Sequence, residues 1–235
     1  KKLQPDCLVS GRIGHGLGDY GIPRDNQMPP GRARGDWEVC ATLNHTWGFR
    51  RDDHQWKPAG LLIQTLVESA SKNSNYLLNI GPDALGRVPG PSAARLRTMG
   101  RWLKANGESI YGAGPSPFAH DFPWGRMTTK GRTVYLHFFT KPAKQFELRG
   151  LKTRVLSASP LLARGTKLAV QQSRDTATGL PVLKVDLSKL RYVAPVTVVA
   201  LKLAAKPEVV TGPIQEPDGS ITLLSAEAAV KPSKA

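Results

Sequence analysis

The chain has 235 residues, 40% of them hydrophobic and 22% charged, with 23 glycines and 19 prolines. This composition is typical of a folded protein rich in turns, and it excludes a disordered or collagen-like chain. The formal net charge of +15 raises nucleic acid as a partner, but the basic residues are scattered and no nucleic-acid-binding motif accompanies them. The longest apolar run falls far short of a membrane span. Neither nucleic acid nor a membrane is therefore expected as a partner.

The cysteines and histidines carry no pattern of a metal or redox site. Cys7 and Cys40 each lie in an apolar, strand-like run, so free buried thiols are expected in preference to a disulfide. His15, His45 and His54 lack the paired spacing of metal ligands, and no metal and no cofactor is expected. The chain opens without a methionine or a secretory signal, which predicts that it begins partway through a longer protein.

A short strand and a long loop are predicted before Trp37. The run Cys7-Leu8-Val9 is strand-like, and the segment Gly11–Tyr20 that follows it holds four glycines. Closely spaced glycines indicate a loop in which the backbone turns tightly or approaches a ligand. Prolines at positions 23, 29 and 30 exclude a helix as far as residue 31. Long loops that follow a strand of a barrel are where sites are built.

Two buried strands with a helix between them are predicted next. The apolar run Trp37–Leu43 ends in the polar and aromatic cluster Asn44–Phe49, and a second run, Tyr76–Ile80, ends at a Gly-Pro pair. A helix is predicted from Pro58, because apolar residues recur at helical spacing as far as Ala70. Such β/α units place ligand-binding residues at the carboxyl ends of their strands.

A second helix is predicted over Ser92–Ala105, with Arg95 and the other basic residues on its outer face and Asn106-Gly107 as its end. After Gly112 the composition changes. A Gly/Pro-rich linker, residues 113–123, is followed by short runs of alternating apolar and polar residues that are separated by turns. These runs are Thr133–Phe139, Phe146–Leu148, Thr153–Ser157, Leu168–Gln172, Val182–Leu187 and Val196–Leu203. They predict an all-β antiparallel sandwich domain over residues 124–205. The tail, 206–235, holds one further predicted strand, Ile221–Leu224.

Several pieces of the first part match one known family in order and spacing. They are Leu3-Gln4-Pro5-Asp6, Gly11-Arg12, Gly18-Asp19-Tyr20, Trp37-Glu38 with Cys40, Asn44 with Trp47-Gly48-Phe49, Asn75-Tyr76-Leu77-Leu78-Asn79-Ile80-Gly81-Pro82, and Asn106-Gly107-Glu108 with Ile110-Tyr111-Gly112. The set resembles the α-L-fucosidases of glycoside hydrolase family 29. The resemblance implies that residues 1–112 are the last strands of a TIM-like (β/α)8 barrel, an α/β barrel that needs eight strands where this part holds about three. In the family a β-sandwich follows.

The resemblance implies retaining hydrolysis of terminal α-L-fucose without a cofactor. That reaction needs two carboxyl groups about 5–5.5 Å apart, one as nucleophile and one as general acid/base. The family's nucleophile is an aspartate on an earlier barrel strand, so it is expected upstream of this chain. The expected partners are a fucosylated glycan or L-fucose and the upstream half of the barrel, in the same protein or a separate chain. The resemblance leaves a homo-oligomer open and implies a periplasmic, extracellular or lysosome-type location.

The family's acid/base glutamate has no counterpart in the matching loop, Gly18–Pro29. One alignment places Arg24 at its position and the other places Gln27, and neither side chain can donate a proton as a carboxylic acid does. Asp25 and Glu38 are the carboxylates that could take over. The alternative role of Asp25 is that of a solvated turn residue. The alternative role of Glu38 is that of a carboxylate that holds a loop. A catalytically impaired fucose-binding protein of the same fold is the alternative function.

Three residues are candidates for contact with the sugar. By the resemblance, Arg12 would hydrogen-bond fucose hydroxyls or the nucleophile, with a surface residue of a glycine loop as its alternative. Trp47 fits the family's aromatic that packs against the apolar face of the sugar, with core packing as its alternative. His45 lies at the same rim and could touch a ligand, with a structural role as its alternative.

Overall fold

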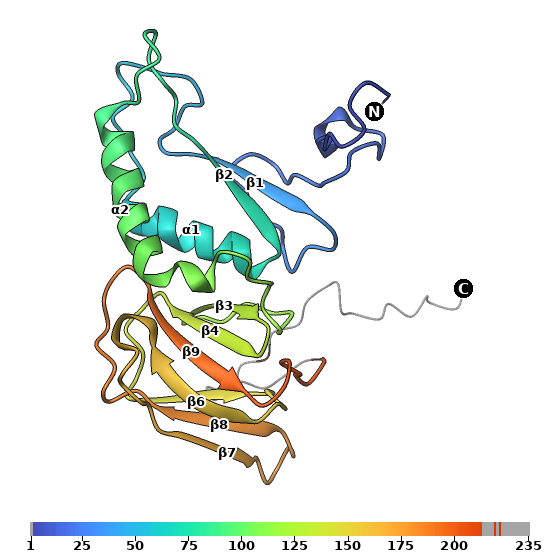
Figure 1. Cartoon of the computed structure of the whole chain (residues 1–235), viewed down its shortest axis with the longest axis vertical. Helices are drawn as coiled ribbons and strands as arrows, with labels where there is room; N and C mark the ends of the chain where they lie inside the picture. The colour runs from blue at the N-terminus through green and yellow to red at the C-terminus, as the bar shows by residue number, and fades with distance from the viewer. Residues whose placement is uncertain (1, 213–218, 220, 222–235) are drawn as a thin grey trace.

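A computed structural model describes residues 2–212, 219 and 221, and Figure 1 shows the whole chain. Within these residues the chain is mostly β-sheet with few helices. The strand predicted at Ile221–Leu224 lies outside the described residues except for Ile221, whose side chain is exposed. Neither helix of the described part is long and apolar enough to cross a bilayer.

The first part is a parallel strand pair with helices on one face. Strands β1 (Trp37–Thr42) and β2 (Ser74–Asn79) pair in parallel, and helix α1 (Ala59–Ser71) connects them. Helix α2 (Gly90–Asn106) follows β2 and packs against α1. Asn73 has a left-handed backbone (φ 62°) in the turn between α1 and β2. The two predicted strands and both predicted helices are confirmed, with ends shifted by a few residues.

The two faces of the β1–β2 pair differ because side chains alternate along a strand. The register pairs Val39 with Tyr76, and Tyr76 packs into a cluster with α1 and α2. The opposite face carries Glu38, Cys40 and Leu77, and the Leu77 side chain is 50% exposed. The Glu38 face is therefore turned away from the helices.

The segment before β1 runs along the free edge of β1. The Gly21 amide donates to Asp36 O at 2.9 Å, and the Glu38 amide donates to Gly21 O at 2.9 Å. The strand predicted at Cys7-Leu8-Val9 is wrong, because the chain there makes one parallel bridge, from Ser10 to Tyr20, and then a 3-10 turn. Two physical reasons account for this. Leu8 is 76% exposed and buries no face, and the Ser10 hydroxyl accepts the Arg12 amide, which favours a turn.

The second part consists of two antiparallel sheets with one core between them. Their strand orders are β3-β4-β9-β6 and β5-β8-β7. The bounds are β3 Gly125–Lys130, β4 Thr133–Phe138, β5 Gln145–Arg149, β6 Val155–Pro160, β7 Val170–Arg174, β8 Pro181–Asp186 and β9 Thr197–Leu203. The sequence reading missed β3, which has one large apolar residue, Met127, and a buried Thr128 that donates to Ser109 O at 2.7 Å.

Strand β4 is buried on both of its faces. Leu136 and Phe138 belong to the core between the two sheets, whereas Tyr135 belongs to the cluster shared with the helices. In Figure 1 α1 accordingly lies between the β1–β2 pair and the sheet that contains β4. Phe118 and Phe122, from the segment predicted as a linker, are buried in the core of the two sheets. That segment is thus packed against the sandwich.

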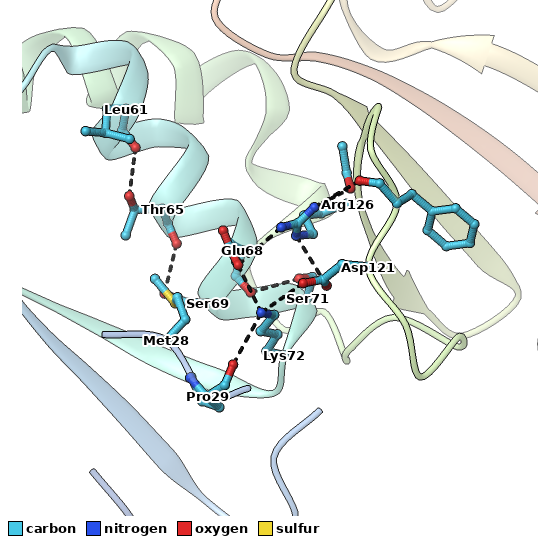
Figure 2. A network of polar contacts seen from close by, with 12 residues as sticks. Met28, Pro29, Leu61, Thr65, Glu68, Ser69, Ser71, Lys72, Asp121 and Arg126 are labelled. Atoms are coloured by element: carbon cyan, nitrogen blue, oxygen red, sulfur yellow. Dashed lines mark hydrogen bonds and ion pairs between the residues drawn. The ribbon is translucent and has the colours of Figure 1, made fainter. Parts of the chain in front are cut away.

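A buried polar network joins the first part to the second (Figure 2). The Lys72 side chain is 8% exposed and forms ion pairs of 3.0 Å with both Glu68 and Asp121. Arg126 of β3 reaches the same two carboxylates, at 3.3 and 3.4 Å. Lys72 Nζ also donates to Pro29 O at 3.3 Å. The end of α1, the sandwich and the loop before β1 are therefore held at one point.

Candidate functional site

Arg12 and Asp25, both singled out in the sequence, are brought together as an ion pair. The Arg12 guanidinium donates to Asp25 Oδ1, and the two side chains are 51% and 41% exposed. The hydrogen bond to Asp25 raises the pKa of Arg12 above its ordinary value. Burial, followed by the charge of Glu38, raises the pKa of the Cys40 thiol, which Arg12 and Asp25 also influence. These four side chains thus form one cluster beside β1.

Two glycines explain how Arg12 reaches this position. A Cβ on Gly18 would lie 2.3 Å from Gly11 Cα, and a Cβ on Gly11 would lie 2.7 Å from Tyr20 O. The two backbone stretches therefore cross at a distance that only glycine permits. The Gly11 amide donates to Tyr20 O at 2.8 Å and closes the crossing. Arg12, the next residue, is carried by this junction.

The loop with the acid/base position is attached to the free edge of β1. Residues 24–27 form a turn, the Arg24–Gln27 turn, in which the Gln27 amide donates to Arg24 O at 3.0 Å. Asn26 adopts a left-handed backbone (φ 58°), which asparagine tolerates well. Its amide donates to Cys40 O at 2.8 Å, and its Oδ1 accepts the Thr42 amide at 3.0 Å. The turn is thereby fixed beside the carboxyl half of β1.

The carboxylates and Gln27 differ in their surroundings. Glu38 is half-buried, and its Oε1 accepts a hydrogen bond from Cys40 Sγ at 3.6 Å. Asp25 is exposed and is held by its ion pair with Arg12. Arg24 and Gln27 are exposed at the two ends of the turn. Glu38 therefore contacts Cys40 and Asp25 contacts Arg12, and neither of the two aligned acid/base positions supplies a carboxyl group.

Trp47 and His45 lie in the loop that follows β1. The Trp47 side chain is 41% exposed, which is not the environment of a core residue, and its carbonyl accepts Asn79 Nδ2 at 2.6 Å. Because Asn79 ends β2, this bond ties the loop to the carboxyl end of that strand. His45 is exposed, and its amide donates to Asp53 Oδ2 at 3.1 Å. Both predicted contact residues thus lie at the rim where β1 and β2 end.

Lys57 is a site residue that the sequence reading missed. Its Nζ donates to Asn26 Oδ1 and Thr42 O, both at 2.7 Å, and to Thr42 Oγ1 at 3.2 Å. Partial burial lowers the pKa of Lys57 from its ordinary value. A lone Lys-Pro pair ahead of a helix carries no signal for this role, because the contact spans 31 residues of chain.

A cavity of about 770 Å³ lies away from this cluster, beside residues 29–35 and Trp37. It borders the amino end of β1, whereas ligands of parallel sheets bind at the carboxyl ends of the strands. The side chains described above, and not this cavity, therefore define the candidate site.

Known proteins match the same part of the chain. The model of the family described as Alpha-L-fucosidase matches residues 1–108. The tissue α-L-fucosidase of Mus musculus is 32% identical over 190 residues, which are 76% of this chain and 41% of the mouse protein. The α-L-fucosidase of Dictyostelium discoideum is 40% identical over 113 residues, 45% of this chain and 24% of that protein.

Solved structures extend the similarity into the second part. The α-L-fucosidase isoenzyme 1 from Paenibacillus thiaminolyticus is 33% identical with a TM-score of 0.75, over 86% of this chain and 51% of that one. The α-L-fucosidase from Vibrio sp. strain EJY3 is 26% identical with a TM-score of 0.86, over 99% of this chain and 42% of that one. The chain spans about half the length of these proteins, or less. Residues 1–108 thus match the α-L-fucosidase family model, and the similarity to solved α-L-fucosidases continues beyond them.

Proposed function

We propose that this chain is the carboxyl-terminal part of a retaining α-L-fucosidase, which removes terminal α-L-fucose from glycoconjugates or oligosaccharides. The observation that carries the proposal is the Arg12–Asp25 ion pair, which influences Cys40 beside Glu38 on β1, inside the segment that matches the family. A retaining glycosidase needs a pair of carboxyl groups on the two sides of the scissile bond. This chain supplies one member of the pair, and an upstream segment supplies the nucleophile.

In the proposed enzyme the first part forms the last strands of a TIM-like barrel. The face of β1 and β2 that carries Glu38 and Leu77 then turns toward the barrel interior, and the helices lie outside. Arg12 has donors to spare beside its pair with Asp25 and hydrogen-bonds the sugar or the nucleophile's carboxylate. The half-exposed indole of Trp47 packs against the apolar face of fucose.

The general acid in this proposal is a carboxyl group beside Cys40, Asp25 or Glu38, in place of the glutamate that the loop lacks. Asp25→Asn and Glu38→Gln, made in the full-length protein, separate the two. The variant that removes the acid lowers turnover of 4-nitrophenyl α-L-fucoside by about 10²–10⁴-fold, and added azide restores part of it because an external nucleophile needs no base. If the unmodified protein releases no nitrophenol from the α-fucoside, the proposal is overturned.

A second candidate is a fucose-binding protein of the same fold with impaired catalysis. Arg24 and Gln27, which occupy the two aligned acid/base positions, favour it. This candidate predicts saturable binding of L-fucose in calorimetry with no turnover, even when azide is present. Turnover of the α-fucoside would exclude the fucose-binding protein with impaired catalysis.

The partners of the proposed enzyme are a fucosylated glycan and the upstream half of the barrel. A location outside the cytoplasm, whether periplasmic, extracellular or lysosomal, belongs to the proposal. One relative, from Rattus norvegicus, is named a plasma α-L-fucosidase and supports an extracellular setting.

A further inference from the structure

Lys57 is a half-buried residue of the site whose ammonium makes three hydrogen bonds to the protein. A lysine ammonium has three donors, and those of Lys57 meet three neutral oxygens at the end of β1, from Asn26 and Thr42. With its donors used in this way, the ammonium has none left to offer a substrate. Its effect must therefore pass through the groups that it holds.

The group that it holds most directly is the side chain of Asn26. Asn26 Oδ1 accepts Lys57 Nζ at 2.7 Å, the Thr42 amide at 3.0 Å and the Thr42 hydroxyl at 3.2 Å. Asn26 stands between Asp25 and Gln27, which the sequence connects with the acid/base function. A fixed Asn26 fixes both neighbours, because the left-handed backbone of Asn26 sets their directions.

Lys57 is itself held in place from α2. Arg95 Nε donates to Lys57 O at 2.6 Å, and the Arg95 guanidinium lies 5.7 Å from the centre of the Trp56 ring. The Lys57 amide donates to Leu43 O at 2.9 Å. Arg95, predicted from the sequence to be an outward residue, is half-buried for this reason. A chain of contacts thus runs from α2 through Lys57 to Asn26.

We propose that Lys57 is a positioning residue, which holds the Arg24–Gln27 turn against the carboxyl end of β1 through Asn26 and so places Asp25, the acid/base candidate on that turn. The inference rests on the proposed function for its catalytic consequence. The structural part of the inference is that the turn depends on Lys57, and this dependence can be measured without any substrate.

The first test follows amide hydrogen exchange in this chain. The Thr42 amide lies on the free edge of β1 and is protected by Asn26 Oδ1, so it reports on the contact. Lys57→Met and Asn26→Gly should each speed its exchange roughly tenfold or more, since bonds to a charged group are the stronger ones. Asn26→Asp keeps both the acceptor and the left-handed backbone and should retain protection. Lys167→Met, a change at an exposed lysine of the sandwich, is the matched control.

Two outcomes of this test overturn the inference. One is unchanged Thr42 exchange in Lys57→Met, whatever the effect of Asn26→Gly. The other is an equal loss of protection at Thr42 and at Leu136, in the middle of β4, because Lys57 would then support the fold as a whole.

The second test uses the full-length protein and two α-L-fucosides. Protonation by the acid matters for a poor leaving group such as methanol and little for 2,4-dinitrophenol. Lys57→Met should therefore lower kcat/KM about tenfold or more for the methyl fucoside and much less for the dinitrophenyl fucoside. An equal loss on both contradicts a positioning role. If the unmodified protein cleaves neither, the proposed function fails, while the exchange test still decides whether Lys57 holds the turn.

Discussion

Arg12 and Asp25 form an ion pair with both partners about half exposed, which separates its effect on stability from its effect on function. Exposed pairs contribute about 0–1 kcal/mol, so Arg12→Gln should leave the free energy of unfolding in urea nearly unchanged. Loss of the guanidinium should still lower kcat/KM on an α-L-fucoside by about 10-fold or more, as expected for a charged hydrogen bond to the sugar. A variant that loses several kcal/mol of stability, or none of its activity, would contradict this assignment.

His137 should make the stability of the chain depend on pH. It is fully buried, its Nε2 lies 3.0 Å from Ser109 Oγ, and burial lowers its pKa to about 4. The unfolded state, with a pKa near 6.5, takes up a proton first as the pH falls, so stability decreases between about pH 6.5 and 4. Between pH 7 and pH 5 the titration of His137 should lower the free energy of unfolding by about 2 kcal/mol.

His137→Gln keeps a hydrogen-bonding group for Ser109 and removes the titration. Urea unfolding at pH 7 and at pH 5 should therefore show a smaller difference between the two pH values for His137→Gln than for the unmodified chain. An equal difference in both proteins would assign the pH dependence to other groups.

Some residues of the candidate site can be singled out from the sequence, and others cannot. Short motifs single out Arg12, Asp25 and Trp47 as candidates, although they do not indicate that Arg12 pairs with Asp25 or that Asn79 contacts Trp47 O. Lys57 was not recognisable, because its role depends on a turn far away in the chain. Local sequence identifies residues that lie in short motifs. Contacts between segments far apart in the chain are seen only in the tertiary structure.

At the scale of elements, the network around Lys72 fastens α1 to the sandwich (Figure 2). Removing one partner of a buried ion pair leaves the others uncompensated, at about 3–5 kcal/mol. Because Asp121 is 43% exposed, a loss of about 2–3 kcal/mol is expected for Lys72→Met, measured as the free energy of unfolding.

Arg50→Met provides the matched control for Lys72→Met. Arg50 pairs with Asp52 where both side chains are mostly exposed, 60% and 72%, so its loss should leave the free energy of unfolding nearly unchanged. Equal effects of the two substitutions would show that the Lys72 network adds nothing beyond a surface pair.

The elements with a clear hydrophobic period, α1 among them, were predictable, and those without one were not. Cys7-Leu8-Val9 has the composition of a strand, but it pairs with the chain only beside Asp19-Tyr20 and has no buried face. Strand β3 shows the reverse. Its Thr128 is polar but buried, because its hydroxyl donates a hydrogen bond to Ser109 O. In both cases tertiary contacts outweighed local preference.

At the scale of the molecule, the sequence predicted the order of the parts, a parallel β/α segment followed by antiparallel sheets. It did not predict that α1 would pack between them or that Phe118 and Phe122 would fill the core of the sheets. The chain covers 41% of its mouse relative, and the face of β1 that carries Glu38 is turned away from the chain's own helices. In the proposed enzyme that face lines the interior of the barrel.

The most direct test of the account is the anomer that the full-length protein releases first. Proton NMR of 4-nitrophenyl α-L-fucoside, recorded from the moment of mixing, should show α-L-fucose appearing before mutarotation produces the β anomer, because a double displacement retains configuration. β-L-Fucose as the first product would contradict the retaining mechanism and the paired-carboxylate site. The absence of any fucose would contradict the assignment of this chain to an active fucosidase.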